Sequence, residues 1–342
     1  MDLTLDADQE STRELLRRLL AQEVPSSVVR EAEPLGHSPA LWATLAGAGI
    51  PGMGMAAELG GGGAGLPMLV VAALEAGRVM APVPLVEHLV ATRVIAALDP
   101  GHPALADLVA GAAIAAFAPV AVTAGRAALV PGGAVADVVV ALDDADLVAC
   151  HGAAPGAATR NHASAPLAGR DLRPMDRRLL ASGPAGAATF ADAGAEWRVL
   201  TAATLAGLAA AALDLAVAYV KERHQFGVPI GSFQGIQHGL ADLPGPVAGA
   251  ELLTHEAAWA LATSSAAPTG ARGAELAVMA FVFASGVARA TTAAAVQYHG
   301  GYGVAEEYDA QLLYRRARGW SLVAGDPSDD LDRLGGLLVT VA

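Results

Sequence analysis

One stretch constrains the fold more than any other part of this chain: residues 219–242, which read YVKERHQFGVPIGSFQGIQHGLAD. A long apolar run, residues 199–220, leads into it and predicts a helix. Gly227 and Pro229, a residue that tolerates left-handed backbone followed by a helix breaker, predict where that helix stops. Apolar side chains spaced i, i+3 and i+7 from Phe233 predict a second helix. The stretch therefore predicts a corner between two helices.

This corner gathers the side chains that a large, flat, anionic ligand needs. Arg223 offers a planar guanidinium that matches phosphate oxygens, and Gln225 offers an amide. Phe226 and Phe233 offer aromatic faces for stacking. Backbone N–H groups are also free where a helix begins. An ordinary helical corner with a solvated, charged end would carry the same residue types, so these alone leave both interpretations open.

The spacing within the corner resembles the signature of the acyl-CoA dehydrogenase family. The pattern R-x-Q-F-G-x-P-I-x-x-F-Q-x-x-Q-H-x-L-A-D covers residues 223–242, and a second motif of that family, QYHGGYG, follows at residues 297–303. A weaker resemblance extends over the whole chain and includes the segments ELGGGG and LEAGRVMAPVP. The resemblance implies a mainly α fold with a small β domain (α+β): an N-terminal helical domain, a middle β-barrel domain and a C-terminal four-helix bundle.

The periodicity of the chain divides it in the same way. We expect an N-terminal helical domain at 1–112, a middle β domain with short β-branched runs at 113–192, and a C-terminal helical bundle at 193–342. The glycine pattern at 60–65 follows a helix and a loop rather than a strand, so we do not expect a Rossmann unit. The bundle helices are expected at residues 197–222, 232–243, 247–263 and 270–300.

Composition argues against several functional classes. The chain has 342 residues and a formal net charge of −13, without the clustered Lys and Arg that a nucleic-acid partner requires. Asp214 lies inside the long apolar run and would cost about 2.5–3.5 kcal/mol at the centre of a bilayer, so we expect a buried helix and no membrane partner. The single Cys150 offers no disulfide and no metal site, and no signal peptide is visible, so we expect a cytoplasmic protein without metal.

The resemblance also implies an activity and a cofactor. Members of the family oxidise an acyl-CoA substrate to its α,β-enoyl form, with FAD as the hydride acceptor and a carboxylate as the base. Each flavin site in the family is shared between two subunits. By position, Arg223 is implied to meet the pyrophosphate, while Phe233 and Ile236 line the adenine side unless they pack in the bundle core. The residues implied to bind FAD are Arg223, Gln225, Phe226, Phe233, Ile236, Gln297, Gly300 and Gly301.

The catalytic Glu of the family has no counterpart at either of its usual positions. The position after the glycine turn falls on Ala324, and the position at the start of the corner helix falls on Trp197. Glu196 precedes Trp197 by one residue, which is about 100° of rotation on a helix. Asp326 is a second acid, two residues after Ala324. The family loop resembling T-E-P-x-A-G-S-D, which meets the flavin edge, also has no counterpart between residues 117 and 142.

An intact corner without a base resembles the short, base-lacking subunit of heteromeric acyl-CoA dehydrogenases of the steroid side-chain type. This hypothesis implies a second subunit that carries the catalytic Glu, an α2β2 heterotetramer, and the CoA thioester of a sterol or bile-acid side chain as substrate. One alternative is a homotetrameric enzyme whose base has moved to Glu196 or Asp326. Another is a scaffold that binds acyl-CoA or flavin without turnover.

Overall fold

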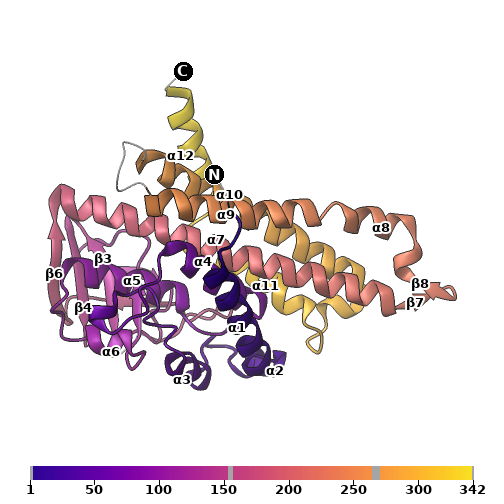
Figure 1. The fold of residues 1–342 in the computed structure, drawn as a ribbon, viewed down its shortest axis with the longest axis horizontal. Helices are drawn as coiled ribbons and strands as arrows, with labels where there is room; N and C mark the ends of the chain where they lie inside the picture. Colours follow the sequence, from indigo (N-terminus) through magenta and orange to yellow (C-terminus); the bar gives the residue numbers. More distant parts are fainter. Residues whose placement is uncertain (1–2, 153–156, 264–269, 341–342) are drawn as a thin grey trace.

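The computed structural model describes residues 3–152, 157–263 and 270–340. Helices make up both the N-terminal and C-terminal regions, and short strands occupy the middle region (Figure 1). This arrangement confirms the expected fold class, mainly helical with small β-sheets. The long helix α7 (Gly183–Glu222) runs through the molecule and contacts elements of all three regions.

The N-terminal region is a group of helices whose starts follow from local sequence. Asp6 caps the first helix through a capping box with Gln9, and Pro residues occupy the first turns of α3 and α4. Most of α4 is buried, which explains its nearly continuous apolar sequence. The helices are α1 (Ala7–Glu23), α2 (Ser26–Glu31), α3 (Pro39–Gly47), α4 (Leu66–Arg78), α5 (Leu85–Leu98) and α6 (Leu105–Val109).

The middle region contains two small sheets. The four-stranded sheet has the order β1-β3-β4-β6, with β1 parallel to β3 and the other pairs antiparallel, and β2 pairs with β5. The β-branched run in β3 is buried on both faces, as expected for a covered sheet. The strands are β1 (Ala115–Phe117), β2 (Arg126–Val130), β3 (Val138–Asp143), β4 (Asp146–His151), β5 (Ala168–Asp171) and β6 (Asp176–Ser182).

Helix α7 begins at Gly183, not near Trp197 as its apolar pattern predicts, because the segment GPAG at its start forms a first helical turn instead of a loop.

Glycines let α7 and α4 meet backbone to backbone. A Cβ on Gly207 would lie 2.0 Å from the Leu74 carbonyl oxygen, and a Cβ on Gly77 would lie 2.0 Å from that of Thr204. The expected domain boundary at residue 192 falls inside α7, and the division into three domains stays a prediction.

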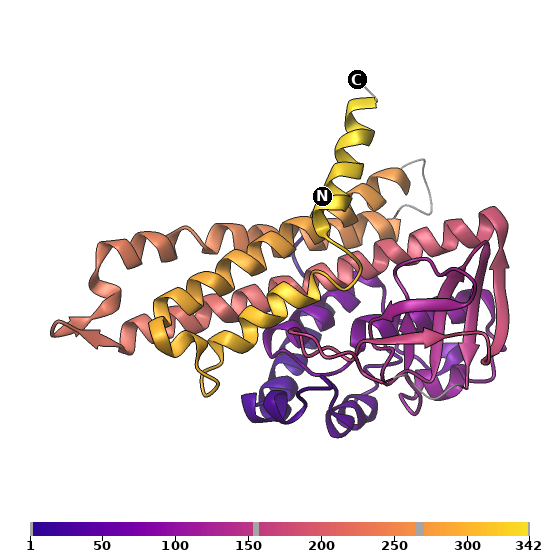
Figure 2. The same cartoon turned by 180° about the vertical axis from the view of Figure 1, so that it is seen from behind.

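The C-terminal bundle consists of α7, α9 (Pro244–Thr263), α10 (Gly270–His299) and α11 (Ala310–Trp320). The prediction that residues 232–243 form one of its four core helices is wrong: α8 (Gln234–Ala241) is short, has no fully buried residue and lies at the end of the bundle. α12 (Pro327–Thr340) projects from the other helices (Figure 2).

Two stretches, α7 and residues 272–304, are long and apolar enough to cross a membrane. In the apolar window of α7, 72% of the residues are buried inside the fold, and in that of the second stretch the share is 50%. Both are therefore core helices of the bundle, as expected for the apolar run with Asp214.

Candidate functional site

The corner between α7 and α8 is a short β-hairpin at the end of the molecule opposite the middle-region strands (Figure 1). α7 ends at Glu222, and β7 (His224–Gln225) pairs antiparallel with β8 (Val228–Pro229). Phe226 and Gly227 form the turn with φ of 53° and 82°, the two positive angles of a type I′ hairpin. The expectation that Gly227 and Pro229 stop the helix is therefore wrong, because the helix ends earlier and these residues belong to a hairpin.

Arg223 is the residue directly after α7, and its guanidinium has no carboxylate partner in the part of the chain that the structure describes. Its Cζ atom instead lies 5.5 Å from the centroid of the Tyr302 ring, within the range of a cation–π contact. Tyr302 belongs to the 3-10 helix η4 (Gly300–Val304), which follows α10. An Arg that rests on an aromatic ring keeps its N–H donors for an external anion.

Exposed apolar side chains surround Arg223. Phe226 is 93% exposed and Phe233 is 38% exposed, and their rings meet edge to face with centroids 6.2 Å apart. Val228 is also exposed, and Ile236 on α8 is half-buried. Contiguous apolar surface of this kind marks a place where a ligand or another protein binds.

The glycine turn after α10 leaves its backbone open. Gly300 has a φ of 60°, and a Cβ added to Gly300 or Gly301 would meet nothing within 4 Å. Gln297 is exposed on the last turn of α10. Gly303 has a different role, since a Cβ there would lie 2.4 Å from the Val296 carbonyl oxygen. The first two glycines therefore give a ligand access to the main chain, and the third permits close packing.

The structure brings the two sequence motifs together. His299 is buried and stacks on Tyr219, the ring that precedes the corner. α8 also packs on α10, where the Tyr298 hydroxyl would lie 2.1 Å from a Cβ on Gly239. Sequence reasoning missed His299 and Tyr302, although both stand inside the QYHGGYG motif. All eight residues that the sequence proposes for FAD consequently lie at this one end of the bundle.

The corner carries donors and stacking faces of the kinds that could hold a dinucleotide such as FAD, and it is open on one side. Arg223 offers unpaired donors and Gly300–Gly301 offers open backbone. Gln225 donates from Nε2 to the His224 carbonyl at 2.8 Å, which leaves its Oε1 as an acceptor. Neither of the two cavities described below includes a residue of the corner. The corner therefore has donors and stacking faces without enclosing walls.

Both acids proposed as a relocated base already accept hydrogen bonds, although both bonds to Asp326 go to Oδ1. Glu196 accepts hydrogen bonds from Nε and Nη2 of Arg93 at 2.9 and 3.1 Å. Asp326 accepts from the backbone N–H and the hydroxyl of Ser328 at 2.9 and 2.8 Å, and these bonds lower the pKa of Asp326. Ala324, in the turn after α11, ends in a methyl group.

The segment after β1 offers no side chain to a flavin edge. It reads A-P-V-A-V at residues 118–122 and carries no hydroxyl or amide group. Ala118 and Val122 are buried against the sheets, while Val120 is 53% exposed. Residues 118–122 therefore supply none of the polar side chains of the family loop.

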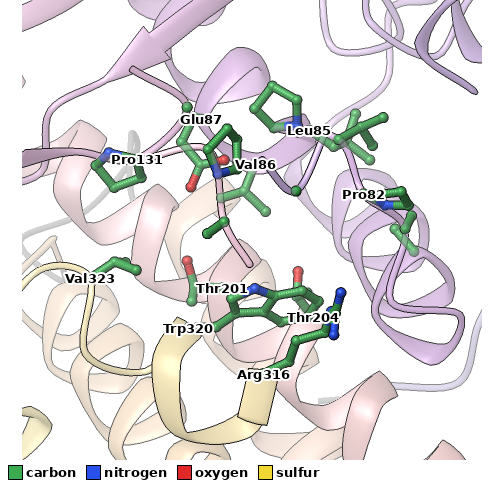
Figure 3. Close-up of a pocket in the computed structure, with 18 of the residues that line it drawn as sticks. Pro82, Leu85, Val86, Glu87, Pro131, Thr201, Thr204, Arg316, Trp320 and Val323 are labelled. Carbon is green, nitrogen blue, oxygen red and sulfur yellow. The ribbon is translucent and has the colours of Figure 1, made fainter. Parts of the chain in front are cut away.

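The more enclosed of two cavities, here called the main cavity, lies between α5, α7 and α11 and has a volume of about 90 Å³ (Figure 3). Its walls are mostly apolar. Trp197 lines this cavity, while its neighbour Glu196 lines a second, more open hollow, as the 100° rotation between adjacent helical residues requires. Polar side chains also line the main cavity: Glu87, Ser164, Thr201, Thr204 and Arg316, with the indoles of Trp197 and Trp320.

The buried Arg316 has a structural partner. Its Nη2 donates to Glu33 at 3.1 Å, and burial lowers the pKa of Arg316 to about 10. The same carboxylate also accepts from Arg315 at 2.8 Å. Among the residues described, no three His, Cys, Asp or Glu side chains lie close enough together to hold a metal ion.

Comparison with known proteins gives two family matches that together span most of the chain. The family model described as "Acyl-CoA dehydrogenase, C-terminal domain" matches residues 186–328, and "Acyl-CoA dehydrogenase, N-terminal domain" matches residues 6–104. The acyl-CoA dehydrogenase IpdE2 of Mycolicibacterium smegmatis is 32% identical over 338 residues, which covers 96% of this chain and 98% of the relative.

Two solved structures share the fold over nearly the whole length. The Tcur3481-Tcur3483 steroid ACAD variant is 28% identical with a TM-score of 0.85, and the match covers 98% of this chain and 99% of the other. The ChsE4-ChsE5 complex of Mycobacterium tuberculosis has a TM-score of 0.88 at 22% identity and covers 99% of each chain. The second likeness is one of fold alone.

Proposed function

The chain belongs to the acyl-CoA dehydrogenase family of FAD-binding oxidoreductases, and we propose that it lends the pyrophosphate and adenine half of an FAD site to a catalytic partner subunit. The observation that carries this proposal is the guanidinium of the half-buried Arg223, which has no carboxylate partner among the described residues. It lies at the same end of the bundle as the open backbone of Gly300 and Gly301. Because this half-site is open to solvent, a second chain is needed to enclose the dinucleotide.

Each corner residue has a task in this proposal. Arg223 donates charge-assisted hydrogen bonds to phosphate oxygens, which are about twice as strong as neutral ones. Gln225 and Gln297 supply amides for the polar edges of the dinucleotide. Phe226 and Phe233 cover its apolar faces and exclude water. FAD, when bound, supplies the hydride acceptor that the side chains of this protein cannot provide.

The partner subunit supplies the base in this proposal. The abstraction of an α-proton needs a carboxylate with a free lone pair beside the substrate. In this chain Ala324 cannot accept a proton, and the carboxylate of Glu196 is occupied by Arg93. The Tcur3481-Tcur3483 structure, at 28% identity, is named as a pair of different chains, which supports a heteromeric assembly, α2β2, for this protein as well.

The substrate class and the cellular location are each supported by a separate observation. The Tcur3481-Tcur3483 relative is a steroid ACAD by name, and we infer that the substrate here is the CoA thioester of a steroid side chain. Cys150 is free and buried, and burial raises the pKa of its thiol to about 11, which keeps it unreactive. A protein without disulfides fits the reducing cytoplasm.

Expression of the chain alone and together with a candidate partner, an acyl-CoA dehydrogenase chain that carries the catalytic Glu, tests this proposal. We expect a colourless or insoluble product alone, and a yellow complex with absorbance near 450 nm and dehydrogenase activity on co-expression. A yellow, active protein from this chain alone would instead support a homomeric enzyme. Flavin that binds to the complex without any electron transfer would support a scaffold.

A further inference from the structure

The aromatic ring beneath Arg223 rests on a second aromatic ring. Tyr302, which carries the Arg223 guanidinium at 5.5 Å from its ring centroid, packs on Tyr308 with ring centroids 5.1 Å apart and planes 34° from parallel. Tyr308 lies in the short segment between η4 and α11. Both rings are exposed to solvent, so their position depends on how the segment of residues 305–309 is held.

Arg30 of α2 holds this segment from the N-terminal region. Its Nη2 donates to Oδ1 of Asp309 at 2.6 Å, and its Nη1 donates to the carbonyl oxygen of Glu306. Asp309 directly follows Tyr308 and precedes α11 without capping that helix through its side chain, so its carboxylate is left for Arg30. One guanidinium therefore binds the segment on both sides of Tyr308.

A second ion pair, of opposite polarity, fixes α11 against the same part of the N-terminal region. Glu33, two residues after α2, accepts from Arg315 at 2.8 Å and from the buried Arg316 at 3.1 Å. The partners of Arg30 and Glu33 are separated by about two turns of α11. Two contacts of opposite polarity specify one alignment of α2 on α11, because the reverse alignment would oppose like charges.

We propose that Arg30 is a positioning residue for the flavin half-site, a role that rests on the proposed function, and that it acts through Tyr308 and Tyr302 on Arg223. Its hydrogen bonds within the described chain go to the 305–309 segment and not to any of the eight residues proposed for FAD. Without Arg30 the segment moves, and the Tyr302 ring moves with it. Arg223 then loses the surface that orients its N–H donors toward the phosphates.

The test measures the dissociation constant of FAD in the assembled complex, by serial dilution of the purified holo complex and the fluorescence of released FAD. Arg30→Gln removes the charge, and Arg30→Lys keeps a cation within reach of Asp309. Arg93→Gln is the matched control. The pair Arg93–Glu196 is also partly exposed and also joins the N-terminal region to a bundle helix, and each of the two arginines donates to one backbone carbonyl as well.

We expect Arg30→Gln to weaken FAD binding about 2- to 5-fold, which is the contribution of one exposed cation–π contact. Arg30→Lys should retain most of the affinity, and Arg93→Gln should bind FAD as the wild type does. With FAD in excess, the turnover number of Arg30→Gln should equal that of the wild type. Thermal unfolding should give the two Gln variants similar Tm values, since each loses one partly exposed ion pair. Wild-type FAD affinity in Arg30→Gln, or equal weakening by Arg93→Gln, would overturn the proposal.

Tyr302→Leu separates the proposed route from a general loosening of the fold. In the Tyr302→Leu background the route is already broken, so Arg30→Gln should cause no further loss of FAD affinity. The same 2- to 5-fold loss in both backgrounds would overturn the route through the tyrosine rings.

Arg223→Gln distinguishes failure of the positioning role from failure of the proposed function. If Arg223→Gln weakens FAD binding and Arg30→Gln does not, the half-site stands and the role of Arg30 is wrong. If neither substitution changes FAD binding, the half-site itself is wrong, and the role of Arg30 fails with it.

Discussion

His299 stacks on Tyr219 with ring centroids 4.0 Å apart and planes 22° from parallel, and this contact joins the end of α10 to the end of α7. Arg223 follows Tyr219 by one helical turn, and Gly300 directly follows His299. The imidazole Nδ1 lies 2.7 Å from the Ala295 carbonyl oxygen, which fixes the plane of the ring. The relative position of the guanidinium and the glycine turn therefore depends on this pair of rings.

Loss of the His299 ring should loosen the corner. His299→Ala removes a buried ring and its stacking, so we expect the free energy of unfolding to fall by about 2–4 kcal/mol. Denaturant titration of the purified protein measures this change. His238→Ala, on the exposed face of α8, is the control and should stay within about 0.5 kcal/mol of the wild type. Equal effects of the two substitutions would show that the stacked rings do not hold the corner.

Phe226 should be unfavourable for stability and favourable for function. Its φ of 53° is a left-handed conformation that costs a non-glycine residue about 1–2 kcal/mol, and its ring is almost fully exposed. Phe226→Asn creates the Asn-Gly turn that type I′ hairpins prefer, so the chain should become more stable by about 0.5–1 kcal/mol. The assembled complex should lose flavin about 10-fold faster, because an aromatic contact is missing. A variant with raised stability and unchanged flavin retention would contradict this role.

Glu196 should be dispensable for catalysis. Its carboxylate pairs with Arg93, and both side chains are partly exposed, so the pair contributes about 1 kcal/mol or less to stability. Glu196→Gln in the co-purified complex should therefore retain nearly full dehydrogenase activity in a steady-state assay. General-base catalysis contributes roughly 10²–10⁴-fold, so a loss of several hundredfold would identify Glu196 as the base after all.

Burial raises the pKa of Glu87, and this shift predicts how stability depends on pH. Well below pH 4.5 the carboxyl group is neutral in both the folded and the unfolded chain, so its ionisation does not change the free energy of unfolding. As the pH rises from 4.5 through the folded-state pKa, the unfolded chain releases its proton first, so the folded state loses stability. Glu87→Gln stays neutral at every pH. Its Tm should match the wild type near pH 4 and exceed it at pH 7, and a difference that does not vary with pH would contradict the buried carboxyl group.

Periodicity and motif spacing predicted the larger part of the fold. α10 was expected at 270–300 and forms Gly270–His299, because apolar side chains recur along it at helical spacing. β3 and β4 follow the β-branched runs from Val138 and Leu147. The sequence did not predict the early start of α7, because the Gly and Pro residues of the segment GPAG usually indicate a turn. The hairpin was missed because Phe-Gly is not a usual turn pair, although the backbone of its two short strands pairs locally.

The candidate site was predictable where residues adjoin in sequence, and not where the fold creates the contact. The spacing in residues 223–242 indicated a ligand-binding corner, but the contact between Arg223 and Tyr302 depends on how α7 and α10 pack. Glu87 was missed in the same way. One acid in the apolar helix LVEHLVATRVIAAL was the available signal, and only the structure places it opposite Thr201 across a cavity.

The flavin content of the assembled complex after substitution of Arg223 is the most direct measurement of the central claim. Arg223→Gln removes the charge-assisted hydrogen bonds to phosphate, which contribute about 1.5–3 kcal/mol, while Arg18→Gln on α1 changes the net charge equally. We predict that both variants assemble with the partner in the wild-type ratio, and that only Arg223→Gln weakens flavin binding, by roughly 10- to 100-fold. Full flavin content in the Arg223→Gln complex after dilution would contradict the account.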